Sequence, residues 1–132
     1  MEREAGEVFG QPGKTSWTPA EIVAETTNLP GIVGALISLQ DGLLVSGRVP
    51  AGMNGETVAA FLPQVFGRMA HYTRELKFGE PSYVGLGLPD YSLHIYKTGD
   101  VYFLVMGRAG EQAPLEQLRV MAAQLERQSK PN

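Results

Sequence analysis

The chain has 132 residues, of which 43% are hydrophobic and 19% are charged, with a formal net charge of -3 and no cysteine. This composition is typical of one globular domain; it excludes disulfides, thiol catalysis and thiolate metal sites, and the lack of a basic block disfavours a nucleic-acid partner. No apolar run approaches membrane-spanning length, and the acidic, polar start lacks the features of a signal peptide, so we expect a cytoplasmic protein without membrane insertion.

Residues 1–16 are mostly charged, small polar, glycine and proline residues, with Val8 and Phe9 as the one large apolar pair. Because so little of this segment can be buried, we expect it to form a flexible tail. The folded domain is expected to span residues 17–128, and residues 129–132 are expected to form a short C-terminal tail.

A capping pattern marks the first helix. Thr18 is placed to accept a hydrogen bond from the backbone of Glu21, Glu21 can return one to Thr18, and Pro19 takes the first helical position. Trp17 stands just before the cap, where a hydrophobic staple begins. Since Pro30 and the glycine after it cannot continue a helix, this helix is expected to be short.

Two apolar, β-branched runs follow, over residues 32–39 and 43–49, and the Asp41-Gly42 pair between them is typical of a tight turn. These runs predict a β-hairpin. Asn54 is then placed to cap a long helical pattern that runs to about Lys77.

Three more strands and a final helix complete the chain. The strands are expected as a meander over residues 83–88, 91–97 and 101–108, and Pro114 opens the helix. The runs at 32–37 and 101–106 are apolar on both faces, which predicts central strands of a sheet covered by helices on both sides. The predicted fold is therefore an α/β (α+β) three-layer domain with the element order α-β-β-α-β-β-β-α.

The long helix carries more apolar surface than a helix on one face of a sheet needs. Its apolar arc covers about 180°, whereas about 100° suffices to face a core. The excess predicts a protein interface, and the alternative is a wide stripe buried under the domain's own loops. Core and interface are expected to divide these residues, without a prediction of which flank does which: Ala59, Phe61, Leu62, Val65, Phe66, Met69, Ala70 and Tyr72. Pro63 is expected to bend the helix.

No motif in the sequence predicts catalysis, a cofactor or a metal. Residues 10–15 resemble the end of a phosphate-binding loop but lack its first glycine, because Val8 stands there. Residues 85–90 begin like a dinucleotide fingerprint, but Asp90 replaces the third glycine. His71 and His94 have no partners at ligand spacing and are interpreted as surface or edge residues. We therefore expect a protein that is not an enzyme.

The hairpin sequence resembles that of a known family. Residues 29–38, Leu-Pro-Gly-Ile-Val-Gly-Ala-Leu-Ile-Ser, followed by residues 40–46, Gln-Asp-Gly-Leu-Leu-Val-Ser, resemble the opening hairpin of the Roadblock (dynein light-chain) family, which includes bacterial MglB-like regulators of small Ras-like GTPases. The later elements follow in that family's order, so the resemblance covers about residues 18–127. Pro63 in the long helix and the length of the N-terminal segment depart from the family pattern.

The resemblance implies a five-stranded, mostly antiparallel sheet with one long helix on one face and two helices on the other. It also implies homodimers in which the long helices pair and the third strands join edge to edge. Gly85 and Gly87 would then let the partner approach closely, the alternative being local flexibility.

The function implied by the resemblance is a non-enzymatic, homodimeric adaptor or regulator that binds a small Ras-like GTPase and changes GTP hydrolysis only by positioning the GTPase's own groups. One alternative is a sensory module that encloses a small molecule between sheet and helix. Few polar side chains favour it, because Tyr83, Tyr96 and Tyr102 are interpreted as strand aromatics with hydroxyls near a rim. A structural scaffold subunit without a GTPase client is the other alternative.

Overall fold

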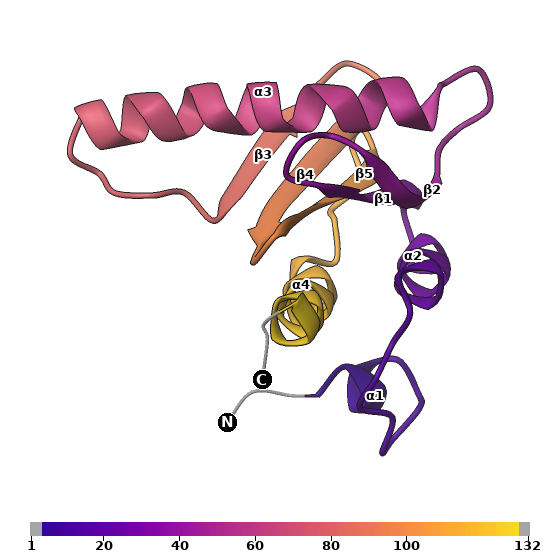
Figure 1. The fold of residues 1–132 in the computed structure, drawn as a ribbon. Coiled ribbons are helices and arrows are strands. Elements are labelled where there is room, and N and C mark those ends of the chain that lie inside the picture. Colours follow the sequence, from indigo (N-terminus) through magenta and orange to yellow (C-terminus); the bar gives the residue numbers. More distant parts are fainter. Residues whose placement is uncertain (1–3, 130–132) are drawn as a thin grey trace.

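The computed structural model describes residues 4–129, which form a five-stranded sheet between layers of helices (Figure 1). The helices are α1 Ala5–Val8, α2 Pro19–Thr27, α3 Gly55–Glu75 and α4 Leu115–Ser129. The strands are β1 Ile32–Leu39, β2 Leu44–Arg48, β3 Tyr83–Gly87, β4 Tyr91–Thr98 and β5 Val101–Arg108. The strand order is β2-β1-β5-β4-β3, and all neighbouring strands are antiparallel.

The two strands predicted to be central lie at the middle of the sheet. β5 pairs with β1 on one side and β4 on the other, and β1 lies between β5 and β2. Six consecutive residues of β5 are buried, because its side chains on both faces meet helices. β2 and β3 form the two edges of the sheet.

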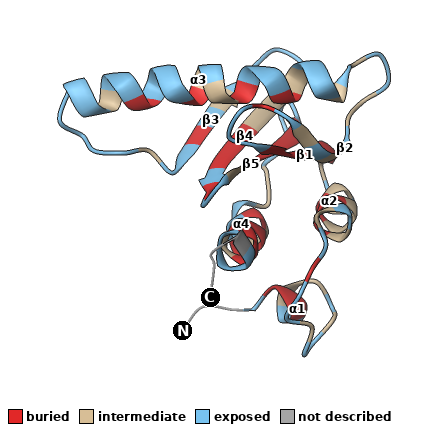
Figure 2. Ribbon diagram, in the orientation of Figure 1, coloured by how far each residue is buried: buried red, intermediate tan, exposed pale blue. Residues whose placement is uncertain are grey.

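Two hydrophobic cores lie on opposite faces of the sheet. On one face α3 packs over Leu36 and Leu104, and on the other α2 and α4 pack over Phe103 and Val105. Figure 2 shows the buried residues of α3 on the side that faces the sheet. The predicted three-layer α+β architecture, with one helix on one face and two on the other, is confirmed.

Local sequence signals explain where the elements begin. The backbone N–H of Glu21 donates to Thr18 Oγ1 at 3.1 Å, and the Thr18 N–H donates to Glu21 Oε1 at 2.9 Å, which confirms the capping box of α2. Asn54 Oδ1 accepts from the Thr57 N–H at 3.1 Å and caps α3. α3 continues through Pro63 as one uninterrupted helix (Figure 1).

The N-terminal segment differs from the flexible tail expected for residues 1–16. Residues 5–8 form the short helix α1, and Ala5 is completely buried against the α2–α4 core. The ring of Phe9 meets the ring of Trp17 edge-on, with centroids 6.3 Å apart. The expectation is therefore corrected: the described part of this segment packs as part of the domain. Residues 1–3 of the expected tail, and residues 130–132 of the C-terminal tail, lie outside the described residues, whereas residue 129 ends α4.

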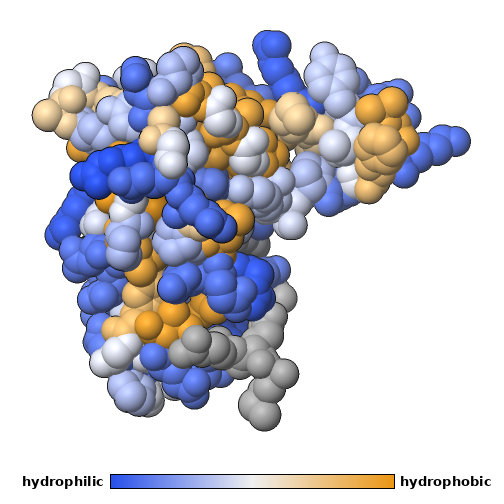
Figure 3. All heavy atoms as spheres, turned by 180° about the vertical axis from the view of Figure 1, so that it is seen from behind, coloured by the Kyte–Doolittle hydropathy of each residue, from blue (hydrophilic) through white to orange (hydrophobic). Residues whose placement is uncertain are grey.

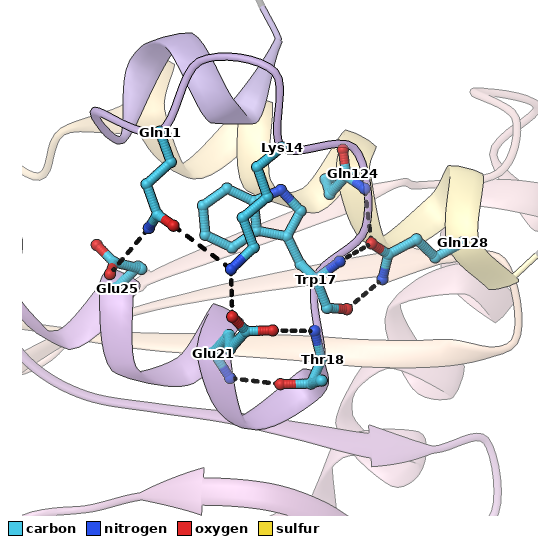
Figure 4. A network of polar contacts seen from close by, with 8 residues as sticks. All are labelled: Gln11, Lys14, Trp17, Thr18, Glu21, Glu25, Gln124 and Gln128. Carbon is cyan, nitrogen blue, oxygen red and sulfur yellow. Dashed lines mark hydrogen bonds and ion pairs between the residues drawn. The ribbon is translucent and has the colours of Figure 1, made fainter.

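Polar contacts hold the segment against α4 and α2 (Figure 4). The Gln128 side-chain amide bonds both backbone groups of Trp17, accepting from its N–H and donating to its carbonyl oxygen, each at 2.8 Å. The Lys14 ammonium lies 4.3 Å from the centroid of the Trp17 ring and forms an ion pair with Glu21. Composition does not reveal such partners, since Gln128 is 111 residues away from Trp17 in the chain.

Candidate protein-interaction surface

The structure decides which flank of the long helix belongs to the core. Phe66 is 2% exposed, and its ring packs on Tyr102 with centroids 5.4 Å apart. The other three residues of the same flank are also buried, on the side of α3 that faces the sheet: Ala59, Leu62 and Ala70. These four positions were candidates for the interface, and they are corrected to core residues of the chain itself.

The large exposed apolar residues of α3 and of its C-cap form an exposed stripe, defined here as Phe61, Met69, Tyr72 and Leu76. Phe61 is 55% exposed and Tyr72 is 59% exposed, and Val65 lies half-buried between them. Spacings of three, four and eight residues place all of them on one side of the helix, beside the core flank. The exposed stripe is therefore the part of the predicted interface that another molecule can reach.

The C-terminal end of α3 extends past the sheet. No residue of α3 after Ala70 is buried, and the helix passes the β3 edge (Figures 1 and 2). Phe78, in the connection to β3, is 79% exposed. In Figure 3 the projecting end of the molecule carries hydrophobic surface. Large exposed apolar side chains gathered at a projection are typical of a protein-interaction site.

The β3 strand lies beside this projection and pairs only with β4, so its outer edge has no strand partner within the described residues. Unpaired strand edges readily accept another strand. A Cβ added at Gly87 would meet no atom within 4 Å, so this position is open to a neighbour. At Gly85 an added Cβ would lie 2.7 Å from the Tyr83 hydroxyl oxygen, so the glycine accommodates the chain's own tyrosine.

The Tyr83 side chain crosses Gly85 to reach a buried histidine. Tyr83 Oη and His94 Nδ1 lie 2.8 Å apart, and His94 Nε2 lies 3.1 Å from Ser92 Oγ. Burial lowers the pKa of His94 below its ordinary value and raises the pKa of Tyr83. The interpretation of His94 as a surface or edge residue is wrong, because strand pairing on both sides and the Tyr83 ring enclose it; His71 is exposed, as expected.

The described residues contain neither a candidate metal site nor a membrane-spanning helix. Among residues 4–129 no group of three or more histidine, aspartate or glutamate side chains is placed to hold a metal ion. Within the same residues no helix is long and apolar enough to cross a membrane. The geometry therefore directs attention to the exposed stripe and the β3 edge.

Comparisons with known proteins agree with this architecture. The chain is similar to the solved structure of Myxococcus xanthus MglB, with a TM-score of 0.74 and 12% sequence identity over 82% of this chain and 91% of MglB. It is similar to a Roadblock/LC7 domain from Streptomyces avermitilis, with a TM-score of 0.69 and 15% identity over 82% of this chain and 92% of that domain.

An MglB structure described as having a tetrameric arrangement gives a TM-score of 0.70 and 17% identity over 88% of this chain and 94% of that one. No protein-family model matches the chain, and no curated protein matches its sequence. At these identities the likeness shows the fold, which is the Roadblock/MglB-like fold expected from the hairpin sequence.

Proposed function

We propose that this chain is a cytoplasmic, non-enzymatic adaptor or regulator that forms a homodimer and binds a small Ras-like GTPase. The observation that carries the proposal is the exposed stripe of α3, which no described residue covers. The Roadblock/MglB-like fold supports it, because the similar structures include MglB proteins, one of them in a tetrameric arrangement.

The dimer we propose uses the exposed stripe and the β3 edge together. Burying the exposed part of each of the four stripe residues contributes about 1–1.5 kcal/mol, or about 10 kcal/mol for both copies. This gain is of the same size as the cost of association, about 4–15 kcal/mol. The stripe alone therefore leaves little surplus, and backbone pairing of β3 with the partner's β3 supplies the remainder. Gly87 leaves space for that approach.

The proposed effect on the GTPase is positional. A dimer surface that holds the switch segments of a GTPase favours the arrangement in which the GTPase's own groups are aligned. The GTPase as the client follows from the resemblance of the hairpin to Roadblock-type regulators, and the dimer follows from the exposed stripe. The two parts of the proposal can therefore be tested separately.

The dimer is tested by light scattering of the wild type and of two matched glutamate variants. Tyr72→Glu places a charge in the exposed stripe, and His71→Glu places the same charge one residue away on the polar side of α3. We expect the wild type and His71→Glu to be dimers and Tyr72→Glu to be a folded monomer. A monomeric wild type, or a dimeric Tyr72→Glu, would contradict the proposed interface.

The client is tested by single-turnover GTP hydrolysis with a small Ras-like GTPase from the same organism. We expect the hydrolysis rate to change with increasing concentration of the wild-type chain and to reach a plateau, which indicates saturable binding of the GTP-bound form. We expect Tyr72→Glu to leave the rate unchanged. If the wild type is a dimer but binds neither nucleotide form of the GTPase, the dimer stands and the client is wrong.

A further inference from the structure

A groove lies on the α4 side of the sheet, near the β3 edge. Its volume is about 440 Å³, within the range of small-molecule sites. The rings of Tyr83 and Tyr96, with centroids 4.9 Å apart, form an aromatic wall. Ala122 and Ala123 of α4 form the facing wall, and their small side chains leave the space open. α4 packs on β4, and the groove is the gap between this helix and the neighbouring edge strand.

One polar group in the wall of this groove is buried without a partner. Thr98, which ends β4, is 4% exposed and lines the groove. Its hydroxyl has no hydrogen-bond partner within the described residues. A buried hydroxyl without a partner costs folding free energy. This cost is removed if a ligand in the groove accepts a hydrogen bond from Thr98.

The other polar groups are mainly hydrogen-bond donors. Burial raises the pKa of Tyr96 to about 12, so its hydroxyl stays protonated at neutral pH and can donate. Arg119 of α4 lines the groove and bonds Glu116 at 2.8 Å. A guanidinium has five N–H donors in a planar fork, so one arginine can donate to two carboxylates. Glu126 is the carboxylate among the lining residues, and it lies two helical turns beyond Arg119.

We propose that this groove binds a small aromatic carboxylate. The aromatic body stacks on the wall formed by Tyr83 and Tyr96 and contacts the alanines of α4. Its carboxylate accepts hydrogen bonds from Arg119 and from the buried Thr98 hydroxyl. The groove lies on the face of the sheet opposite α3, so the proposal does not use the exposed stripe or the GTPase. It shares only Tyr83 with β3, the strand that pairs in the proposed dimer.

The test uses two ligands of the same shape, one with a carboxylate and one with a neutral amide in its place. 2-Naphthoate is the probe, and 2-naphthamide is its neutral control of the same shape. Both are titrated into the isotope-labelled full chain, and amide chemical shifts are followed by NMR. We expect 2-naphthoate to shift the amides of Thr98, Ala122 and Ala123 with a saturable dissociation constant, and 2-naphthamide to bind about tenfold more weakly because it lacks the charge-assisted hydrogen bond.

Three variants tie the binding to this groove. Ala123→Phe fills the space and abolishes the shifts, and Arg119→Gln reduces the difference in affinity between the two ligands. Thr98→Val removes the unpartnered hydroxyl, so the free protein melts at the same or a higher temperature while 2-naphthoate binds more weakly. Ala123 is only half-buried, and a melting curve verifies that its variant folds.

Absence of saturable shifts with 2-naphthoate at millimolar concentration would overturn the proposal. Shifts that persist in Ala123→Phe, or equal affinity of the wild type for the acid and the amide, would also overturn it. The single tryptophan, Trp17, serves as an internal control. Its side chain does not line the groove, so its indole N–H resonance should not shift on titration.

Discussion

Replacing Phe61 and Phe66 by alanine, one at a time, tests the division of α3 into core and interface. Phe66 is 2% exposed, so Phe66→Ala leaves a cavity and should cost about 3–5 kcal/mol of unfolding free energy. Phe61 is 55% exposed, so in the monomer it contributes about half of the burial free energy of a phenylalanine, and Phe61→Ala should lower the unfolding free energy of the monomer by about 1 kcal/mol. The remainder, about 1.5 kcal/mol per copy, is gained only in the dimer.

Because a symmetric dimer contains each residue twice, Phe61→Ala should weaken association by about 3 kcal/mol, which is about a hundredfold in the dissociation constant. Sedimentation velocity over a concentration series measures the dissociation constant, and urea denaturation of diluted samples measures the unfolding free energy. We expect Phe61→Ala to be a folded, weakly associating protein and Phe66→Ala to be strongly destabilised. A Phe61→Ala protein that associates as tightly as the wild type, or two variants of equal stability, would refute this division of α3.

Three further changes have expected outcomes. Gln128→Leu removes both hydrogen bonds to the Trp17 backbone and should cost about 2 kcal/mol by urea denaturation, with a red shift of the single tryptophan's emission; unchanged emission would contradict the packing of the N-terminal segment. Gly42→Ala places a Cβ 3.0 Å from the Ala60 backbone at a φ of 91°, whereas Gly52→Ala has a similar φ of 90° and open space, so Gly42→Ala should lower the melting temperature more; equal losses would refute the contact. Burial lowers the pKa of His94, so the stability contributed by its neutral form is complete above its ordinary pKa of 6.5 and is lost as the pH falls below that value. The unfolding free energy from denaturation curves should therefore fall with pH below 6.5, and His94→Gln should reduce that fall. An unchanged pH dependence in His94→Gln would assign the fall to another group.

Local signals account for most of the predicted fold. The capping pattern at Thr18, the turn at Asp41-Gly42 and the cap at Asn54 act within a few residues, and each element begins where these signals place it. The two-faced apolar runs identified β1 and β5 as central for the same reason, since a run that is apolar on both faces is visible within the strand's own sequence.

Features that depend on contacts between residues far apart in the chain could not be predicted from the sequence. Residues 5–16 look like a tail because the Gln128 side chain that holds Trp17 belongs to the last helix. Helical periodicity located the apolar arc of α3, but Phe61 and Phe66 are equally apolar and only the position of the sheet separates them. The groove beside α4 joins Tyr83 and Arg119 from separate elements. The tyrosines of the three-strand meander were the only part of its lining that the sequence singled out.

Light scattering of the wild-type chain across a micromolar concentration range tests the central claim most directly. The exposed stripe of α3 and the open edge of β3 predict a particle of twice the chain mass, converted to a single chain by Tyr72→Glu but not by His71→Glu. A wild-type protein that stays at the mass of one chain throughout would contradict the account.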